Sequence, residues 1–521
     1  MQIIPVPYDL KQGVGYFQLS DKVKIKSEID LKLVETVDKN ADIVIKKADM
    51  PDEEYKLNVN KQGVEIFAGG EIGAYYALQS VRQLSENELG KNNVPCCEIY
   101  DKPRFEWRGL QLDEARHFFG KEVVKDILDM MFMMKLNVFH WHLTDDQGWR
   151  IEIKKYPLLT AYGSRRGYTH IGGWRCQKIE CVSHYGYYTQ EDIAEIVSYA
   201  NDRGIMVVPE IDFPAHSAAA IASYPWLACR EIEYHVPGYF GSVIPEKLFK
   251  EKHWNRTLCI GKDRVRQFVL DVIDEVSELF PAPYFHIGGD EAPRDEWKKC
   301  PCCQNVMKNN GIASEDDLQG WFNNIVLEHL KSKGKRMIGW NEILSAENLD
   351  KSAIAQYWTP KRDRKAEKYI NSGGKMIMSN HQSFYFDMTY AQYSLKDTYK
   401  YSPASFGVNE ENIKNVLGVE GELWTEWIES RDKLELNYYP RIQALAEVAW
   451  SDDKNKDWNN FLLRLDRFKK FFEYFNINYA VDAVSMPKGL MKKLKIQKQF
   501  FYGDPYMETN LNKIYKAKGE K

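Results

Sequence analysis

The pattern of apolar and polar positions changes near residue 98 and divides the chain. Residues 55–59 alternate apolar and polar side chains, and after a short turn residues 64–67 do the same, which predicts a β-hairpin. Residues 72–84 carry apolar side chains at the three- and four-residue spacing of an amphipathic helix. We therefore expect residues 1–97 to form a small N-terminal α+β domain.

Beyond that domain, short apolar runs alternate with amphipathic helical stretches. Eight runs have the length and composition of buried strands: residues 107–113, 136–143, 205–211, 284–287, 336–340, 353–358, 375–379 and 416–423. Parallel strands with intervening helices, without a glycine-rich nucleotide motif, predict an α/β fold, a (β/α)8 TIM barrel over residues 98–455. Residues 456–521 predict a C-terminal helical extension that packs on the barrel, followed by a basic tail that is solvated.

Composition narrows the classes of partner. The 521-residue chain has 44% hydrophobic and 28% charged residues, as expected of a globular protein with a large core. Its net charge of −4 provides no field that recruits nucleic acid, and no apolar run is long enough for a membrane span. The first residues lack the pattern of a signal peptide, so we expect a cytoplasmic protein, or a periplasmic or secreted one if a leader was removed. Monomer and homodimer both stay open.

The nine cysteines do not form a clear pattern. An odd number argues against a complete disulfide framework, although Cys176 and Cys181 could bridge if the protein is exported. Cys300-Pro301-Cys302-Cys303 has the spacing of half a zinc site, but no second Cys or His group follows it at zinc-finger spacing. We therefore predict no metal site and no cofactor.

Polar and aromatic side chains follow every predicted strand. Barrel enzymes build active sites at the carboxyl ends of their strands, so these side chains are expected to meet at one mouth. In strand order they are Asp113, Glu114, Arg116 and His117; Asp145, Asp146 and Gln147; Glu210, Asp212 and His216; Asp290 and Glu291; Trp340, Asn341 and Glu342; Trp358; Tyr385 and Asp387; and Trp424 and Glu426. Carboxylates, an Arg and aromatic walls are typical of a sugar pocket that protonates a leaving oxygen.

The two carboxylates Asp290 and Glu291 are adjacent and follow Gly288 and Gly289. Most glycosidases place two separate carboxylates on either side of the bond that they cleave. Adjacent residues on an extended chain point to opposite sides, so this pair cannot readily flank one bond. One of the two acids must therefore have another task.

Six motifs resemble those of the family 20 glycoside hydrolases, the β-N-acetylhexosaminidases. They lie at residues 107–118, 140–149, 208–216, 286–291, 339–342 and 421–426, and the resemblance covers about residues 1–450. It implies an exo-acting, retaining enzyme that removes terminal β-linked GlcNAc or GalNAc from an oligosaccharide or glycoconjugate. In this family the substrate's own 2-acetamido oxygen is the nucleophile, and an oxazolinium intermediate forms.

The resemblance also implies a role for each catalytic residue. Glu291 would be the general acid that later deprotonates water, and Asp290 would hold the acetamido N–H and stabilise the oxazolinium charge. Tyr385 would align the acetamido oxygen. His216 with Asp145 would form a relay that touches Glu291 and tunes its pKa. Substrate-binding residues would be the walls Trp340, Trp358 and Trp424 and the hydroxyl-binding groups Arg116, Asp387 and Glu426. The segment between residues 148 and 188 is expected to set preference among glycans.

Three alternatives stay open at this point. A lacto-N-biosidase-like enzyme that releases a disaccharide would need a wider pocket. A catalytically inactive glycan-binding protein would not need the acids Asp290 and Glu291. His140 and His142 share a strand face and mimic a metal pair, which would suit a metal-dependent amidohydrolase, but we expect them to line or orient the barrel because later ligands are missing.

Overall fold

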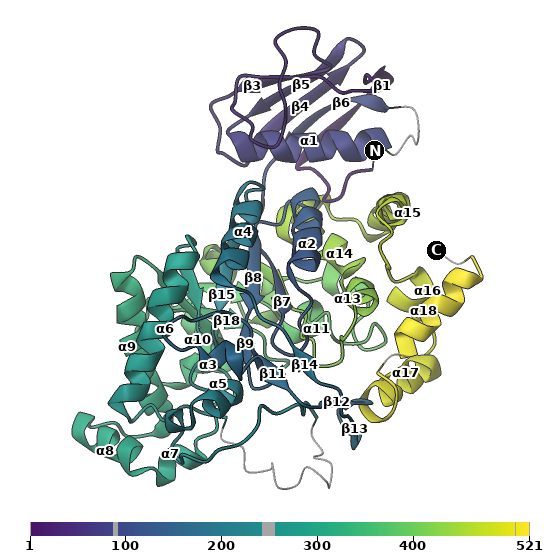
Figure 1. Ribbon diagram of the computed structural model, residues 1–521. Coiled ribbons are helices and arrows are strands. Elements are labelled where there is room, and N and C mark those ends of the chain that lie inside the picture. The colour runs from purple at the N-terminus through teal and green to yellow at the C-terminus, as the bar shows by residue number, and fades with distance from the viewer. Residues whose placement is uncertain (1, 87–91, 242–255, 506, 520–521) are drawn as a thin grey trace.

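The computed structural model describes residues 2–86, 92–241, 256–505 and 507–519. A small N-terminal domain lies at one end of a large barrel, and its helix α1 (Glu71–Glu86) faces the barrel (Figure 1). The sheet of this domain has the order β1-β6-β4-β5-β3-β2. Its strands are β1 (Asp9–Gln18), β2 (Ile25–Ser27), β3 (Ile43–Lys47), β4 (Tyr55–Asn60), β5 (Gly63–Ala68) and β6 (Asn93–Asp101). The expected hairpin and helix are thus present as β4, β5 and α1.

Eight parallel strands close into a barrel in the order β15-β16-β17-β18-β19-β20-β7-β8. They are β7 (Trp107–Asp113), β8 (Val138–His142), β15 (Met206–Glu210), β16 (Tyr284–His286), β17 (Arg336–Trp340), β18 (Ile354–Tyr357), β19 (Met376–Met378) and β20 (Val416–Gly421). Each lies within one of the eight predicted runs, so the predicted TIM barrel is confirmed. The short strands that follow β8 lie at the end of the barrel opposite the N-terminal domain (Figure 1).

Helices and short hairpins complete the barrel. The helices are α2 (Lys121–Met133), α3 (Leu158–Ala161), α4 (Gln190–Asn201), α5 (Ala218–Ser223), α6 (Asp263–Leu279), α7 (Asp295–Lys299), α8 (Pro301–Asn310), α9 (Glu315–Ser332), α10 (Arg364–Asn371), α11 (His381–Phe384), α12 (Leu395–Tyr399), α13 (Arg431–Tyr438) and α14 (Arg441–Trp450). The short strands are β9 (Thr144–Asp145), β10 (Gly148–Trp149), β11 (Arg165–Arg166), β12 (Thr169–Ile171), β13 (Lys178–Glu180) and β14 (His184–Tyr185). None of the described helices combines the length and apolar character needed to cross a membrane.

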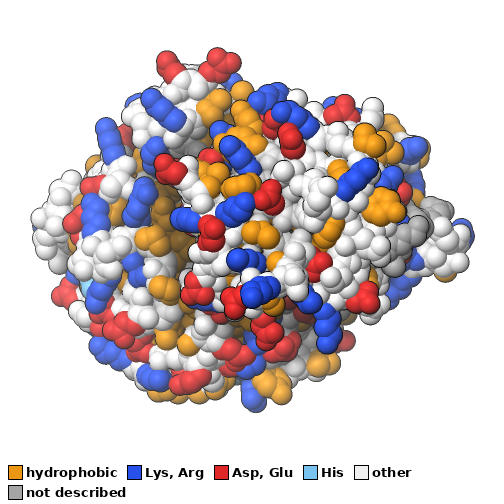
Figure 2. Space-filling model, turned by 90° about the horizontal axis from the view of Figure 1, so that it is seen from above, with side chains coloured by type: hydrophobic (Ala, Val, Ile, Leu, Met, Phe, Trp, Pro, Cys, Tyr) orange, Lys and Arg blue, Asp and Glu red, His pale blue; other side chains and the backbone are white. Residues whose placement is uncertain are grey.

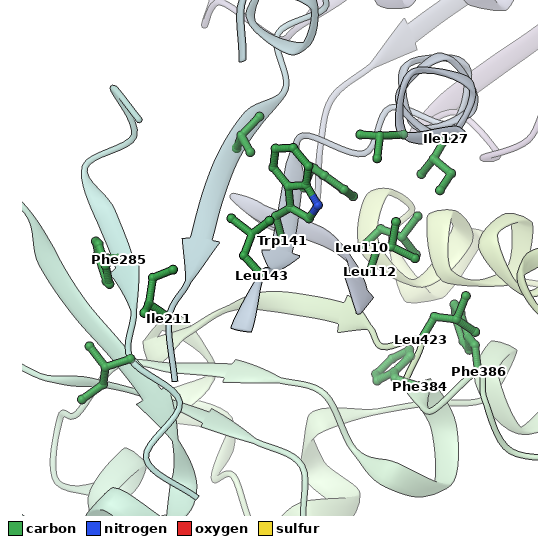
Figure 3. Packing of buried hydrophobic residues seen from close by; sticks show 14 of the residues in the cluster. Leu110, Leu112, Ile127, Trp141, Leu143, Ile211, Phe285, Phe384, Phe386 and Leu423 are labelled. Carbon is green, nitrogen blue, oxygen red and sulfur yellow. The ribbon is translucent and has the colours of Figure 1, made fainter. Parts of the chain in front are cut away.

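The strands separate an apolar outer layer from an interior that changes from apolar to polar along the barrel axis. Leu110 and Leu112 of β7 and Trp141 of β8 point outward, toward helices that include Ile127 of α2 (Figure 3). Since alternate side chains share a face, the residues between them point into the barrel. At the N-terminal end of the barrel this interior is apolar and is filled by Trp107, Val138, Val208, Ile338, Ile354 and Ile377.

The next interior layer is polar, and hydrogen bonds connect its central side chains. His140 Nδ1 lies 2.7 Å from Glu420 Oε1, and Gln356 Nε2 donates to the same oxygen at 2.7 Å. Burial opposes charge on His140, but Glu420 and Glu210 raise its pKa to about 10. A protonated imidazole between two carboxylates compensates their burial. This polar layer lies directly below the residues at the mouth of the barrel and supports them.

A buried ion pair joins the N-terminal domain to the barrel. Lys135 Nζ, just after α2, lies 2.7 Å from Asp101 Oδ2 at the end of β6, and both side chains are inaccessible to solvent. Tyr55 donates its hydroxyl to Asp101 Oδ2 at 2.7 Å, and Trp450 donates its indole N–H to Asp101 Oδ1 at 2.8 Å. Every lone pair that faces the interface is thereby occupied, which fixes how the domains are oriented.

The C-terminal segment corrects one expectation. Helix α15 (Trp458–Tyr474) packs as predicted, but the basic tail is not merely solvated surface. It forms α16 (Asp482–Ser485), α17 (Leu490–Tyr502) and α18 (Met507–Ala517), which lie along one side of the barrel (Figure 1). Phe500 is 4% exposed and packs in a cluster with Tyr385 and Trp427. The lysines of α17 concealed this contact, because only two of its residues, Ile496 and Phe500, are buried.

Charge is distributed evenly on the face that Figure 2 shows. Lys and Arg side chains are interspersed with Asp and Glu rather than gathered into a region of one sign. This face therefore has no extended positive region of the kind that follows a phosphate backbone.

Candidate active site

A cavity of about 180 Å³ opens at the carboxyl ends of the barrel strands. The eleven residues that the sequence singles out as catalytic or substrate-binding all line it: Arg116, Asp145, His216, Asp290, Glu291, Trp340, Trp358, Tyr385, Asp387, Trp424 and Glu426. Sequence reasoning missed four further lining residues as site members: Trp174, Asp212, His381 and Met388. Of these, Asp212 follows β15 and so carries the signal of a strand end, whereas His381 and Met388 carry no signal in the sequence.

The adjacent acids Asp290 and Glu291 sit on a tight turn after β16. Gly288 has φ +64°, and a Cβ atom there would lie 2.0 Å from Asp212 Oδ1, so only glycine lets this backbone pass. Glu291 itself has φ +44°, a left-handed conformation that is strained for a residue with a side chain. The turn separates the two acids: the Asp290 side chain is 16% exposed, whereas that of Glu291 is 57% exposed.

His216 links this pair to a buried chain of charges. Its Nε2 lies 3.4 Å from Asp290 Oδ2 and 3.7 Å from Glu291 Oε2, and its Nδ1 lies 3.1 Å from Asp145 Oδ1. Asp145 Oδ2 in turn lies 2.8 Å from a guanidinium nitrogen of Arg116. Like Glu291, His216 has a left-handed backbone, with φ +47°. The strain at these two facing residues is of the kind that functional sites retain.

The ionisable groups around His216 shift one another's pKa values. Burial would lower the pKa of His216, but Asp145, Asp290 and Asp212 together raise it well above its usual value. Burial would raise the pKa of Asp145, but Arg116 and His216 hold it well below the usual range. Burial and then the Asp290 carboxylate raise the pKa of Asp212. These shifts favour the imidazolium form of His216, the ionised form of Asp145 and the protonated form of Asp212.

Aromatic rings form the walls of the cavity. The Trp358 and Tyr385 rings stack with centroids 5.9 Å apart and planes 23° from parallel, and the Trp424 ring lies 6.3 Å from that of Tyr385. Trp340 donates its indole N–H to Glu210 at 2.8 Å, which holds the ring upright at the end of β17. Flat rings held in this way suit the C–H faces of a pyranose or an acetamido methyl group.

Three ionisable side chains, those of Arg116, Asp387 and Glu426, line the cavity together. Arg116 stands 5.2 Å from the Trp424 ring and is paired with Asp113 at 3.1 Å. Burial, and then the carboxylate of Glu426, raises the pKa of Asp387 well above its usual value. Burial likewise raises the pKa of Glu426, against the opposing effect of Arg116. This group of hydrogen-bonding side chains is able to hold several hydroxyls of one sugar.

The segment between residues 148 and 188 reaches the cavity through Trp174. The C-terminal helix α17 holds this segment, because Arg175 donates its backbone N–H to Phe501 O at 2.8 Å. Trp174 also packs against the cluster that contains Tyr385 and Phe500. The Gly172-Gly173-Trp174 motif was thus the available sequence signal, but nothing in the sequence predicted its contact with residues near 500.

His140 and His142 do not stand apart as a metal pair. His140 lies between Glu420 and Glu210, and His142 lies between Glu210 and Asp145, with its Nε2 2.9 Å from Asp145 Oδ2. These contacts support the orienting role expected for both. The cysteine interpretation needs correction, however. Cys300 and Cys303 do have partners, because the fold brings Cys229 and Cys259 beside them.

Comparison with known proteins agrees with this geometry. The model of the glycosyl hydrolase family 20 catalytic domain matches residues 105–453, and that of domain 2 of the same family matches residues 27–102. A β-hexosaminidase of Porphyromonas gingivalis is 36% identical over 94% of this chain, which spans 65% of that protein's length.

Two solved structures share the fold. An exo-β-N-acetylglucosaminidase of Vibrio harveyi, solved in complex with N-acetylglucosamine, is 30% identical with a TM-score of 0.81, covering 92% of this chain and 78% of its own. A β-N-acetylhexosaminidase of Bacteroides fragilis is 31% identical with a TM-score of 0.79, covering 92% of this chain and 96% of its own.

Proposed function

The chain belongs to glycosyl hydrolase family 20, and we propose that it is an exo-acting, retaining β-N-acetylhexosaminidase. It removes a terminal β-linked GlcNAc or GalNAc from a glycan by substrate-assisted catalysis. The observation that carries this proposal is the turn that places Asp290 and Glu291 side by side in one cavity with Tyr385. A bond flanked by only one of the two acids requires a nucleophile from elsewhere, and the substrate's 2-acetamido oxygen supplies it.

Glu291 is the general acid and base in this proposal. It is the more exposed acid of the pair, so it can reach the glycosidic oxygen on the open side of the cavity. It protonates the leaving oxygen in the first step and deprotonates the incoming water in the second. His216 Nε2 lies 3.7 Å from Glu291 Oε2, so the imidazole lies directly beside this acid.

Asp290 and Tyr385 act on the acetamido group. The Asp290 carboxylate accepts the acetamido N–H and stabilises the positive charge that develops in the oxazolinium ion. The protonated Asp212 does not compete with it for this charge. The Tyr385 hydroxyl donates to the acetamido oxygen and aligns it for attack on the anomeric carbon. Burial raises the pKa of Tyr385 well above its usual value, so the hydroxyl keeps its proton at neutral pH and can donate.

The shape of the cavity supports release of one sugar at a time. Its volume of about 180 Å³ is below the roughly 300–1,000 Å³ of pockets that enclose drug-sized ligands. Arg116, Asp387 and Glu426 line it together, and in this proposal they bind hydroxyls of a non-reducing terminal sugar. Trp340, Trp358 and Trp424 enclose the acetamido group and the pyranose face. A disaccharide-releasing enzyme would need room beyond these walls.

Hydrolysis of nitrophenyl glycosides tests the proposal. We expect nitrophenol release from the β-N-acetylglucosaminide or the β-N-acetylgalactosaminide and none from the plain β-glucoside, which lacks the acetamido nucleophile. The Glu291→Gln variant, assayed on a reducing-end-labelled disaccharide of GlcNAc, serves as the negative control. Equal turnover of the glucoside would refute substrate assistance, and no turnover of any substrate would refute the enzymatic function.

A further inference from the structure

Four cysteine sulfurs meet in one buried cluster outside the active site. They belong to Cys229, Cys259, Cys300 and Cys303, and all four lie within 4.8 Å of one another. Cys259 Sγ is 3.5 Å from Cys300 Sγ and 3.8 Å from Cys303 Sγ, and Cys229 Sγ is 4.0 Å from Cys303 Sγ. From this geometry we propose that the four thiolates bind a structural zinc ion.

The sulfur spacing fits zinc and does not fit disulfides. Tetrahedral zinc with Zn–S bonds of about 2.3 Å places its sulfurs about 3.8 Å apart, close to the observed separations. A disulfide brings one sulfur to about 2.05 Å from a single partner. Cys259 instead lies at nearly equal distances from Cys300 and Cys303, as a shared central ion requires. Four sulfur ligands that leave no open position are typical of a structural rather than a catalytic zinc site.

The backbone segments that carry the four cysteines approach one another closely. An isolated antiparallel bridge pairs Ala228 with Leu258, which holds the segments that carry Cys229 and Cys259 against each other. Cys300 caps the N-terminus of α8 and Cys303 lies in its first turn. A Cβ atom on Gly261 would lie 2.4 Å from the backbone nitrogen of Cys303, so glycine at this position lets the two segments touch.

Charge and burial also favour bound thiolates. Cys259 and Cys303 have no exposed surface and Cys300 has 6%, so unpaired thiolates would be costly here without a cation. The N-terminus of α8 adds partial positive charge next to Cys300 and Cys303. Lys262 adds a further positive charge near Cys229, because its Nζ lies 2.6 Å from the backbone oxygen of the preceding residue, Ala228.

The proposed ion would connect two loops of the active site. Cys229 and Cys259 both lie in the connection between β15 and α6, which also carries Phe240 and Arg256. Phe240 packs with Tyr385, and Arg256 Nε lies 2.5 Å from Asp146 Oδ2. Cys300 and Cys303 follow the Asp290–Glu291 turn through the short helix α7. Zinc would therefore fasten the loop after β15 to the loop after β16.

Metal analysis of the full-length chain tests this proposal without reference to activity. The protein is purified under reducing conditions without a metal-affinity tag, and zinc and iron are measured by mass spectrometry. We expect one zinc ion per chain and no stoichiometric iron. Denaturation with a chelator and no reductant should then expose all nine cysteine thiols to a thiol reagent. Zinc-free protein, stoichiometric iron, or a thiol count lowered by disulfides would each overturn the assignment.

A matched pair of variants locates the ion. Cys302 lies in the same Cys-Pro-Cys-Cys motif but is exposed and outside the cluster. Cys302→Ser should retain the full zinc content, whereas Cys303→Ser should lose it or release it far faster to a chromogenic chelator. If Cys303→Ser does not fold, cobalt substitution of the unmodified chain still decides, since a tetrahedral thiolate site gives intense visible absorption. Zinc loss from both variants alike, or cobalt protein without that absorption, would contradict the proposal.

Discussion

Nε2 of His216 lies 3.4 Å from Oδ2 of Asp290, and the imidazole is flanked on its other side by Asp145. The two carboxylates keep His216 protonated, because they raise its pKa against the effect of burial. The imidazolium is therefore a fixed positive charge next to both acids of the Asp290–Glu291 turn. In the proposed mechanism it holds Asp290 in place for the acetamido N–H, and it lies within reach of Glu291, the proposed general acid and base.

The first prediction compares two neighbouring aspartates. Asp290→Asn should lower kcat on acetamido sugars by about 10²–10³-fold, the cost of removing one group that stabilises developing charge. Asp212→Asn should have a far smaller effect, because burial and the Asp290 carboxylate raise the pKa of Asp212 and favour the protonated form, which asparagine resembles. Steady-state kinetics on the nitrophenyl substrates measures both. Equal losses in the two variants would contradict the assignment of the charge-stabilising role to Asp290.

The second prediction tests the role of Glu291 by comparing substrates with different leaving groups. Glu291→Gln should lower kcat by about 10²–10⁴-fold for a natural glycan, whose leaving alcohol needs a proton. Nitrophenolate leaves without protonation, so its release in the first step should fall much less. Added azide should then restore turnover of the nitrophenyl substrate, because it attacks without a general base. A loss that is the same for both leaving groups and insensitive to azide would argue against general acid and base catalysis by Glu291.

The third prediction concerns alignment by Tyr385. Tyr385→Phe keeps the ring that stacks on Trp358 but removes the hydroxyl. We expect kcat to fall by about 10²-fold, the cost of a nucleophile misplaced by about an ångström, with a small change in KM. Trp358→Phe leaves the Tyr385 hydroxyl in place and makes the aromatic wall smaller, so it should mainly raise KM. A kcat for Tyr385→Phe close to the unmodified value would refute the alignment role.

The fourth prediction links pH to stability through the C-terminal helix α18. Burial raises the pKa of Glu508 from 4.5 to about 7. Between these pH values the folded state holds a proton that the unfolded state has lost, so stability falls as pH rises. The difference corresponds to about 3 kcal/mol, lost in full above pH 7. Glu508→Gln should remove this part of the pH dependence, as measured by denaturant unfolding from pH 4.5 to 8.

A surface substitution provides the control for this measurement. Glu410 is exposed, and Glu410→Gln should leave the pH dependence of unfolding as it is in the unmodified chain. If Glu508→Gln followed the same pH curve as this control, the buried carboxyl of α18 would not contribute to the pH dependence of stability.

Sequence reasoning succeeded where local pattern and strand order carry the information. Buried strands such as β17 are continuous apolar runs, and the parallel barrel then fixes where their carboxyl ends meet. For this reason Trp340, which ends β17, could be placed at the cavity before the structure was known. The same logic brings Arg116 of the first strand next to Glu426 of the last, since β7 and β20 are neighbours in the closed barrel.

Contacts between distant loops could not be predicted in this way. Cys229 and Cys259 approach Cys300 through contacts between loops, among them the bridge that pairs Ala228 with Leu258, and no local pattern encodes that pairing. Phe500 reaches the Tyr385 cluster from a helix whose lysines indicate a solvated surface. In both cases tertiary packing rather than local propensity decides the position.

The most direct test of the account measures whether the substrate's own acetamido oxygen is the nucleophile. Nitrophenyl glycosides whose acetamido methyl carries zero, one, two or three fluorine atoms provide the series, because each fluorine withdraws electron density from that oxygen. The account predicts a steep and regular fall of kcat/KM along the series, with the trifluoro substrate barely cleaved. A kcat/KM that stays constant across the series would show that a protein carboxylate attacks instead, and would contradict the central claim.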